Sequence, residues 1–189
     1  MSHELRTPLN AIIGFSDMLH TQTVTDPVKV QQYAGYVKQA AEHLLALING
    51  ILDVSKIQAG KLTVDRETLD IAVVLSSCLL IIEAKAREKG ISVETAVAPN
   101  IPKLFSDPLR VKQILINLLS NSIKYNRAAG RVVVDCTLTP EGRLRIGVRD
   151  TGEGLAPDKL AQLFQPFNRL GQEANLEQGT GIGLVVCKR

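Results

Sequence analysis

Apolar residues near the start of the chain recur every three or four positions, the spacing of one face of a helix. This first stripe consists of Leu5, Leu9, Ile12, Ile13 and Leu19. A second stripe alternates steps of four and three residues, giving a period of about 3.5 that is typical of coiled coils and bundles. Its members are Val30, Ala34, Val37, Ala41, Leu44, Ile48, Ile51 and Ser55. The pattern predicts two amphipathic helices.

A polar turn over 21–27 separates the two helices, which are therefore expected to form a hairpin. Asp26-Pro27 predicts the start of the second helix, and Gly60-Lys61 predicts its end. Two amphipathic helices cannot bury their apolar faces alone, so we expect two chains to form an antiparallel four-helix bundle. The alternative is that the hairpin packs on the C-terminal part of its own chain.

Helical and alternating patterns follow each other beyond the hairpin. The predicted helices cover 70–89, ended by Gly90, and 108–125, with Asp70 and Asp107 as N-caps and Pro108 at the first helical position. The predicted strands cover 91–98, 131–139 and 143–150, while 62–69 is a strand or a connector. The expected fold class is α+β: a hairpin over 1–61, then a sandwich over 62–189 with helices on one face of a mixed sheet.

Composition narrows the possible partners and compartment. The net charge is only +3 and the basic residues are scattered, which argues against a nucleic-acid partner. Cys78, Cys136 and Cys187 match no metal or disulfide spacing and are expected to be buried thiols in a reducing compartment. The longest apolar run, 71–82, is too short to cross a bilayer, and there is no signal peptide. We expect a cytoplasmic chain without a membrane segment, although the full-length protein can be anchored upstream.

The first helix opens with Ser2-His3-Glu4-Leu5-Arg6-Thr7-Pro8-Leu9-Asn10. His3 and Thr7 are four residues apart and share a helix face, whereas Glu4 lies about 100° around and reaches the imidazole by bending its side chain. Pro8 leaves the carbonyl of Glu4 without its helical partner, which predicts a bend. An isolated histidine on a helix is most often a solvated surface residue, so this motif gains meaning only from the far end of the chain.

Two glycine clusters mark that far end. Asp150-Thr151-Gly152-Glu153-Gly154 closes an apolar strand, and Gly179-Thr180-Gly181-Ile182-Gly183-Leu184 opens a short apolar run. Glycines before a helix allow backbone N–H groups to approach an anion. One such cluster is usually a turn, but two clusters favour a phosphate-binding site.

The helix predicted over 108–125 carries polar residues that fit such a site. Asn117, Asn121 and Lys124 are spaced four and then three residues apart and therefore share one face. Asparagine amides offer neutral oxygens to Mg²⁺, and lysine can meet phosphate as a point charge. The alternative interpretation, without the neighbouring motifs, is a solvated polar face.

The chain resembles the sensor histidine kinases of two-component systems. Five segments match that family's boxes in order: 3–8 the H box, 117–121 the N box, 150–154 the first glycine box, 164–167 the F box and 179–183 the second glycine box. The resemblance implies the Bergerat, or GHKL, ATP-binding fold, which type II topoisomerases and mismatch-repair ATPases share. It also implies a dimerisation and phosphotransfer domain over 1–61 and a catalytic ATP-binding domain over 62–189.

The resemblance implies roles for individual residues. Asn121 would coordinate Mg²⁺, Asp150 would accept a hydrogen bond from the adenine amino group, and 155–178 would be a mobile lid over ATP. The residues implied to contact ATP are Asn117, Asn121, Lys124, Tyr125, Asp150, Gly152, Gly154, Arg169, Gly179, Thr180, Gly181, Gly183 and Leu184.

The implied reaction is autophosphorylation of His3 by Mg-ATP, with Glu4 as the general base. The phosphoryl group would then pass to an aspartate of a response-regulator receiver domain. Thr7 matches the position that orients water when such kinases act as regulator phosphatases. The implied oligomer is a homodimer through the hairpin.

Two other functions compete with this one. A GHKL ATPase without kinase activity would carry a glutamate where this chain has Asn117, and it would lack the H box. A dimerisation or phosphotransfer module would have a degenerate ATP domain, but no nucleotide motif is missing here. Arg189 falls only a few residues into the helix after the second glycine box, whereas family members usually continue through one more strand. We therefore expect a C-terminally incomplete domain.

Overall fold

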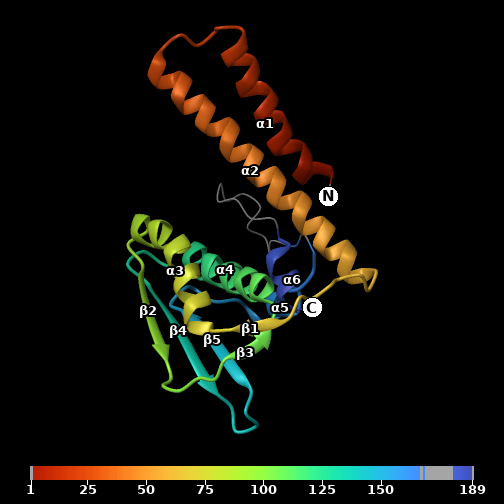
Figure 1. Cartoon of the computed structure of the whole chain (residues 1–189). Coiled ribbons are helices and arrows are strands. Elements are labelled where there is room, and N and C mark those ends of the chain that lie inside the picture. The colour runs from red at the N-terminus through yellow and green to blue at the C-terminus, as the bar shows by residue number, and fades with distance from the viewer. Residues whose placement is uncertain (1, 167, 169–180, 189) are drawn as a thin grey trace. The chain divides into compact units, whose positions relative to one another are not determined.

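The computed structural model describes residues 2–166, 168 and 181–188 (Figure 1). The chain forms two compact units. The first unit contains Met1–Leu62 and Gln162–Arg189, and the second contains Thr63–Ala161.

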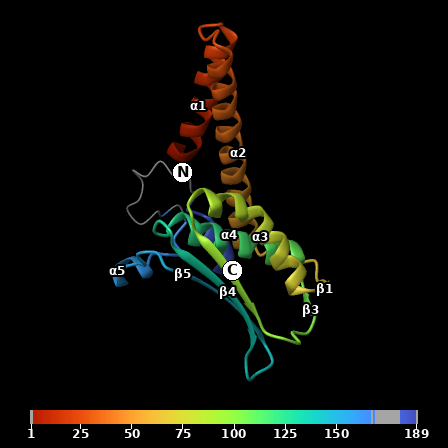
Figure 2. The ribbon, with the colours of Figure 1, turned by 90° about the vertical axis from the view of Figure 1, so that its left-hand side faces the viewer.

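The first unit is built on a helical hairpin. Helix α1 (Ser2–His20) continues through Pro8 and lies alongside α2 (Pro27–Gln58), as both views show (Figures 1 and 2). The Asp26 carboxylate accepts a hydrogen bond of 3.0 Å from the Val28 N–H and caps α2, which Pro27 opens. Gly60 follows the C-cap with a φ of +64°. The predicted start and end of the second helix are therefore confirmed.

The residues that α2 buries coincide only in part with the predicted apolar stripe. Ala40 (7% exposed) and Leu47 (1%) are buried, although neither belongs to the predicted stripe. Ile48, which does belong to it, is 42% exposed. The apolar surface of α2 is therefore wider than one seam, as expected for a helix that has more than one neighbour in a bundle.

The short helix α6 (Gly183–Lys188) also belongs to the first unit. Ile182 and Val185 are buried. A Cβ placed at Gly50 of α2 would lie 3.1 Å from the Ile182 side chain, so α6 packs closely on α2 at this point.

The second unit is a layer of helices on a mixed sheet. Its elements are β1 (Glu67–Leu69), α3 (Ile71–Glu88), β2 (Ser92–Val97), β3 (Leu104–Ser106), α4 (Pro108–Lys124), β4 (Arg131–Leu138), β5 (Leu144–Asp150) and α5 (Pro157–Leu160). The main sheet has the order β2-β4-β5, with β2 parallel and β5 antiparallel to β4. Helices α3 and α4 cover one face of it (Figure 2). This arrangement confirms the predicted α+β class.

Two capping aspartates define where the covering helices begin. Asp70 accepts a hydrogen bond of 2.9 Å from the Ala72 N–H, and Asp107 accepts one of 3.0 Å from the Arg110 N–H. Asp107 also accepts a 3.2 Å hydrogen bond from the Asp65 N–H. The hydrogen bond from Arg110 is the main reason why the pKa of Asp107 lies below its usual range. Both predicted N-caps are confirmed.

The core lies between the helices and the sheet. Leu119, Val132 and Val134 are fully buried there, together with Cys78 and Cys136. Burial raises the pKa of both thiols, which keeps them protonated and unreactive. Cys187 is only half-buried, so the expectation of three buried thiols was wrong for this residue. A short helix such as α6 covers its own side chains less completely than the core of a sandwich does.

The small sheet of β1 and β3 was only partly predicted. Leu69 pairs with Leu104 and Glu67 with Ser106 in an antiparallel register. The segment 62–69 was left open as a strand or a connector, and β3 was not predicted at all. Within the described residues, no helix is long and apolar enough to span a membrane.

Candidate active site

One face of α4 carries the predicted polar residues. Leu115, Leu119 and Ile123 are buried on the core side of the helix. Asn117, Asn121 and Lys124 are half-buried, as expected for residues beside the core-facing stripe. The Lys124 ammonium lies 4.9 Å from the centroid of the Tyr125 ring, a cation–π distance.

The end of β5 lies against the end of α4. The Asp150 Oδ1 atom accepts a hydrogen bond of 2.9 Å from the Gly152 N–H, which fixes the turn after the strand. A Cβ at Gly152 would overlap the carbonyl oxygen of Tyr125, the C-cap of α4. Glycine is therefore required at 152 by close backbone approach. Gly154 has open space around it but a φ of +71°, so glycine is required there by conformation.

Two side chains outside the predicted set join these elements. The Thr151 hydroxyl donates to Asn126 Oδ1 at 3.0 Å and accepts from the Arg131 N–H at 2.9 Å. Asn126 Oδ1 also accepts from the Arg127 N–H at 3.0 Å. Both residues directly follow predicted site residues, and Asn and Thr commonly bond backbone groups in turns. That signal would have marked them as scaffold residues of the site.

The predicted site residues beyond 161 belong to the first unit or lie outside the described residues. Gly181, with a φ of +65°, Gly183 and Leu184 belong to the first unit, and their contribution to nucleotide binding stays a prediction. Arg169, Gly179 and Thr180 lie outside the described residues. The described part of the predicted lid contains α5 and the half-exposed Phe164.

The predicted phosphoacceptor region is the first turn of α1. His3 belongs to this helix, but its side chain lies outside the described part of the chain. Glu4 is half-buried and its Oε2 atom is closed to solvent, while Thr7 is exposed and Pro8 is buried. The carboxylate that follows His3 in the sequence is thus partly shielded from solvent.

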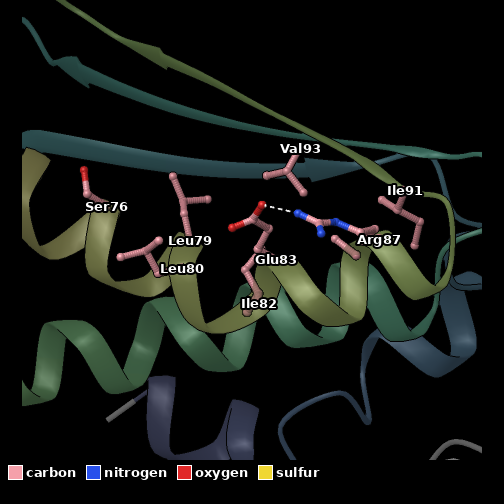
Figure 3. A pocket seen from close by; sticks show the side chains of 9 residues that line it. Ser76, Leu79, Leu80, Ile82, Glu83, Arg87, Ile91 and Val93 are labelled. Carbon is pink, nitrogen blue, oxygen red and sulfur yellow. Dashed lines mark hydrogen bonds and ion pairs between the residues drawn. The ribbon is translucent and has the colours of Figure 1, made fainter.

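A groove of the second unit lies elsewhere, between α3 and β2 (Figure 3). It has a volume of about 620 Å³ and is lined mainly by Leu79, Leu80, Ile82, Ile91 and Val93. Its one cation, Arg87, pairs with Glu83 at 2.7 Å, as the dashed line shows. An apolar lining with a neutralised cation does not suit a polyphosphate, and none of the predicted nucleotide residues lines the groove.

The comparisons with known proteins match both parts of the chain. The family described as His Kinase A (phospho-acceptor) domain matches residues 1–60. The family described as histidine kinase-, DNA gyrase B- and HSP90-like ATPase matches residues 106–189. The fold and site therefore define an ATPase domain of this class joined to a phosphoacceptor hairpin.

Relatives and solved structures extend this result to the whole chain. It is 41% identical over its full length to the non-motile and phage-resistance protein of Caulobacter vibrioides and 40% to the sensor protein GacS of Pseudomonas syringae pv. syringae. It spans 23% and 21% of those relatives. The structure of full-length ShkA in complex with AMPPNP matches 98% of this chain and 38% of its own, with 31% identity and a TM-score of 0.73. Acinetobacter baumannii AdeS, at 24% identity, shares the fold over 98% of this chain and 83% of its own, with a TM-score of 0.74.

The chain belongs to the sensor histidine kinases of two-component systems. It contains the phosphoacceptor hairpin and the α/β ATPase region of that family, as the sequence motifs predicted.

Proposed function

We propose that this chain is the kinase core that autophosphorylates His3 from Mg-ATP and passes the phosphoryl group to an aspartate of a response regulator. One observation carries the proposal: the chain joins a His3-Glu4 helix start to a second unit in which Asp150 and Gly152 lie against the polar end of α4. A nucleotide site without the histidine would support only an ATPase, and the hairpin without that site would support only a relay module.

The nucleotide is proposed to lie along the polar face of α4. The Asp150 carboxylate accepts a hydrogen bond from the adenine amino group, and Lys124 meets the phosphates. Asn121 is half-buried on a polar face, which fits a Mg²⁺ ligand because that ion keeps waters and phosphate oxygens as its other ligands. Bound Mg²⁺ would neutralise charge on the phosphates. The AMPPNP held by ShkA, the relative at 31% identity, supports an ATP site here.

His3 is proposed as the nucleophile. Its unprotonated ring nitrogen attacks the γ-phosphorus, an N–P bond forms, the bond to the bridging oxygen of ADP breaks, and ADP leaves. Glu4 accepts the proton from the other ring nitrogen. The phosphoramidate product then donates its phosphoryl group to the aspartate of a receiver domain. The solved structure of histidine kinase ThkA in complex with the response regulator protein TrrA shares the fold, at 22% identity and a TM-score of 0.69.

Thr7 is proposed to orient water when the same chain dephosphorylates its regulator. It is exposed and lies one helical turn after His3, where a bound regulator can reach it. A Thr7→Ala variant that dephosphorylates the regulator at the wild-type rate would remove this role.

The active form is proposed to be a homodimer through the hairpin. Leu45, Ile48 and Leu52 are 58%, 42% and 51% exposed and follow one face of α2 at helical spacing. Leu9 and Ile13 are likewise exposed on α1. A second hairpin that covers these residues would complete a four-helix bundle.

The domain boundary is proposed to follow residue 61, with 62–189 as the ATP-binding domain. The two family matches, over 1–60 and 106–189, support this division. Since the reaction consumes ATP and serves a response regulator, the core is proposed to work in the cytoplasm.

The test is incubation of the chain with Mg²⁺ and γ-labelled ATP, followed by acid and alkali treatment. We expect protein-bound label that survives alkali, is lost in acid and is absent from His3→Gln. His20→Gln, at the exposed far end of α1, is the matched control and should label normally. Free phosphate without labelled protein would instead support the ATPase alternative.

A further inference from the structure

Strand β2 has an open edge. Among the described strands of the main sheet, β4 lies on one side of β2 and none lies on the other. The Ser92 N–H donates to the Gly130 carbonyl at 3.0 Å and the Ala98 N–H to the Cys136 carbonyl at 2.9 Å, both on the β4 side. Backbone groups alternate between the two sides of a strand, so every second residue of β2 turns its N–H and C=O to the open edge. These residues are Val93, Thr95 and Val97.

Nothing in the sequence of β2 blocks this edge. Natural proteins protect open edges with lysine, proline, bulges or inward-pointing charges. The strand Ser92–Val97 contains neither lysine nor proline. Its one charged residue, Glu94, pairs with Arg131 at 3.7 Å, and its side chain alternates with that of Val93 to the opposite face of the sheet. The backbone groups of the edge are therefore available to another strand.

The groove between α3 and β2 lies directly beside this edge. Val93 lines it from β2, while Leu79 and Leu80 line it from α3 (Figure 3). Leu80 is 74% exposed, which is unusual for a leucine beside a core. The ion pair of Glu83 with Arg87 leaves the groove without an unbalanced charge. The occupant that fits this lining is apolar and uncharged.

The register of the sheet shows how an added strand would meet the groove. Val93 pairs with Val132 and Thr95 with Val134, and both β4 residues are fully buried beneath the helices. The face of β2 that carries Val93 is therefore the core face. A strand added beside β2 would turn every second side chain to that same face, toward the groove. A helix would satisfy its own backbone and leave the edge of β2 unbonded.

We propose that the open edge of β2 and the adjoining groove bind an extended segment of a partner protein, which adds a strand to the main sheet. Main-chain hydrogen bonds to β2 hold the segment, and branched aliphatic side chains at alternate positions cover Leu79 and Leu80. The proposal is independent of the proposed reaction, because the residues that carry it are not those assigned to the nucleotide or to phosphotransfer.

The experiment titrates the whole chain with a fluorescent peptide of alternating valine and threonine that has a lysine at each end. We expect saturable binding below about 1 mM. Two control peptides carry N-methyl groups on the valines or on the threonines, which removes the backbone donors on one side of the strand. One of them should bind at least about tenfold more weakly and the other within about threefold. Loss with methylated valines indicates an antiparallel strand, and loss with methylated threonines a parallel one.

Variants locate the binding site on the chain. Leu80→Glu places a charge in the groove and should weaken binding at least about tenfold. Val73→Glu is the matched control, because Val73 is 67% exposed on α3 but does not line the groove, and it should bind within about twofold. Thr95→Pro removes a donor from the open edge and no bond to β4, and it should also weaken binding. Autophosphorylation and the melting temperature should be unchanged in Leu80→Glu.

Three results would overturn the proposal. The first is no saturable binding below about 1 mM. The second is equal binding by wild type and Leu80→Glu, or by the methylated and unmethylated peptides, since adsorption to an apolar surface needs no strand. The third is a tetramer in light scattering that Thr95→Pro converts to a dimer, because the occupant of the edge would then be a second copy of this chain.

Discussion

Gly152→Ala provides a sharp test of how the nucleotide site is built. The new Cβ would overlap the Tyr125 carbonyl oxygen and lie 2.9 Å from Asp150 Oδ1. Tyr125 is the C-cap of α4, and its backbone cannot move aside as the end of a flexible side chain could. The turn after β5 must therefore shift away from α4 and take Asp150 with it.

The cost can be estimated from the size of the overlap. Forcing one extra methyl group into a close-packed site typically costs about 1–3 kcal/mol. If about 2 kcal/mol of this falls on the nucleotide-bound state, affinity decreases roughly 30-fold, because about 1.4 kcal/mol corresponds to a factor of ten. We also expect a lower melting temperature of the second unit.

The assay is titration with a fluorescent ATP analogue, together with thermal unfolding. Gly154→Ala is the matched control in the same motif, because a Cβ there meets no atom within 4 Å. Its φ of +71° predicts a modest loss of stability, about 1 kcal/mol, from backbone strain alone. A Gly152→Ala chain with wild-type affinity and melting temperature would refute the argument that close approach to α4 forms the site.

Three further outcomes are expected. Asn121→Ala should lower Mg²⁺-dependent autophosphorylation at least 100-fold, like removal of Mg²⁺ with chelator, whereas a rate near wild type would exclude Asn121 as a metal ligand. Folding lowers the pKa of Asp107, so the ionised carboxylate stabilises the folded state. This stabilisation is fully present above the pKa of the unfolded chain, about 3.9, and is lost as the pH falls through the lower pKa of the folded chain. Asp107→Asn should therefore melt at a lower temperature than wild type at pH 7. Below about pH 4 its melting temperature should fall less steeply than that of wild type, and an equal fall in both chains would contradict this. Ile48→Glu should shift the chain from dimer to monomer in light scattering, since it places a charge on the exposed apolar face of α2, and an unchanged mass would exclude that face as the interface.

The candidate site could be predicted where its residues are close in sequence. The spacing of Asn117, Asn121 and Lys124 placed them on one face of α4, and the strand pattern placed Asp150 at the end of β5. The connection between these elements could not be predicted. Thr151 and Asn126 are 25 residues apart and meet only because β4, β5 and α4 pack together.

The sequence alone determined the parts of the fold that depend on neighbouring residues. Each of the helices α2, α3 and α4 begins where an aspartate accepts a hydrogen bond from a backbone N–H two or three residues further on. These aspartates are Asp26, Asp70 and Asp107. Side-chain periodicity likewise determined the two long helices of the hairpin.

The tertiary structure decided the features that depend on contacts between residues far apart in the sequence. Strand β3 has only three residues, too few for a periodic signal, and it exists as a strand through its pairing with β1. The buried positions Ala40 and Leu47 were not in the predicted stripe, because periodicity shows that a face is apolar but not which neighbour covers it.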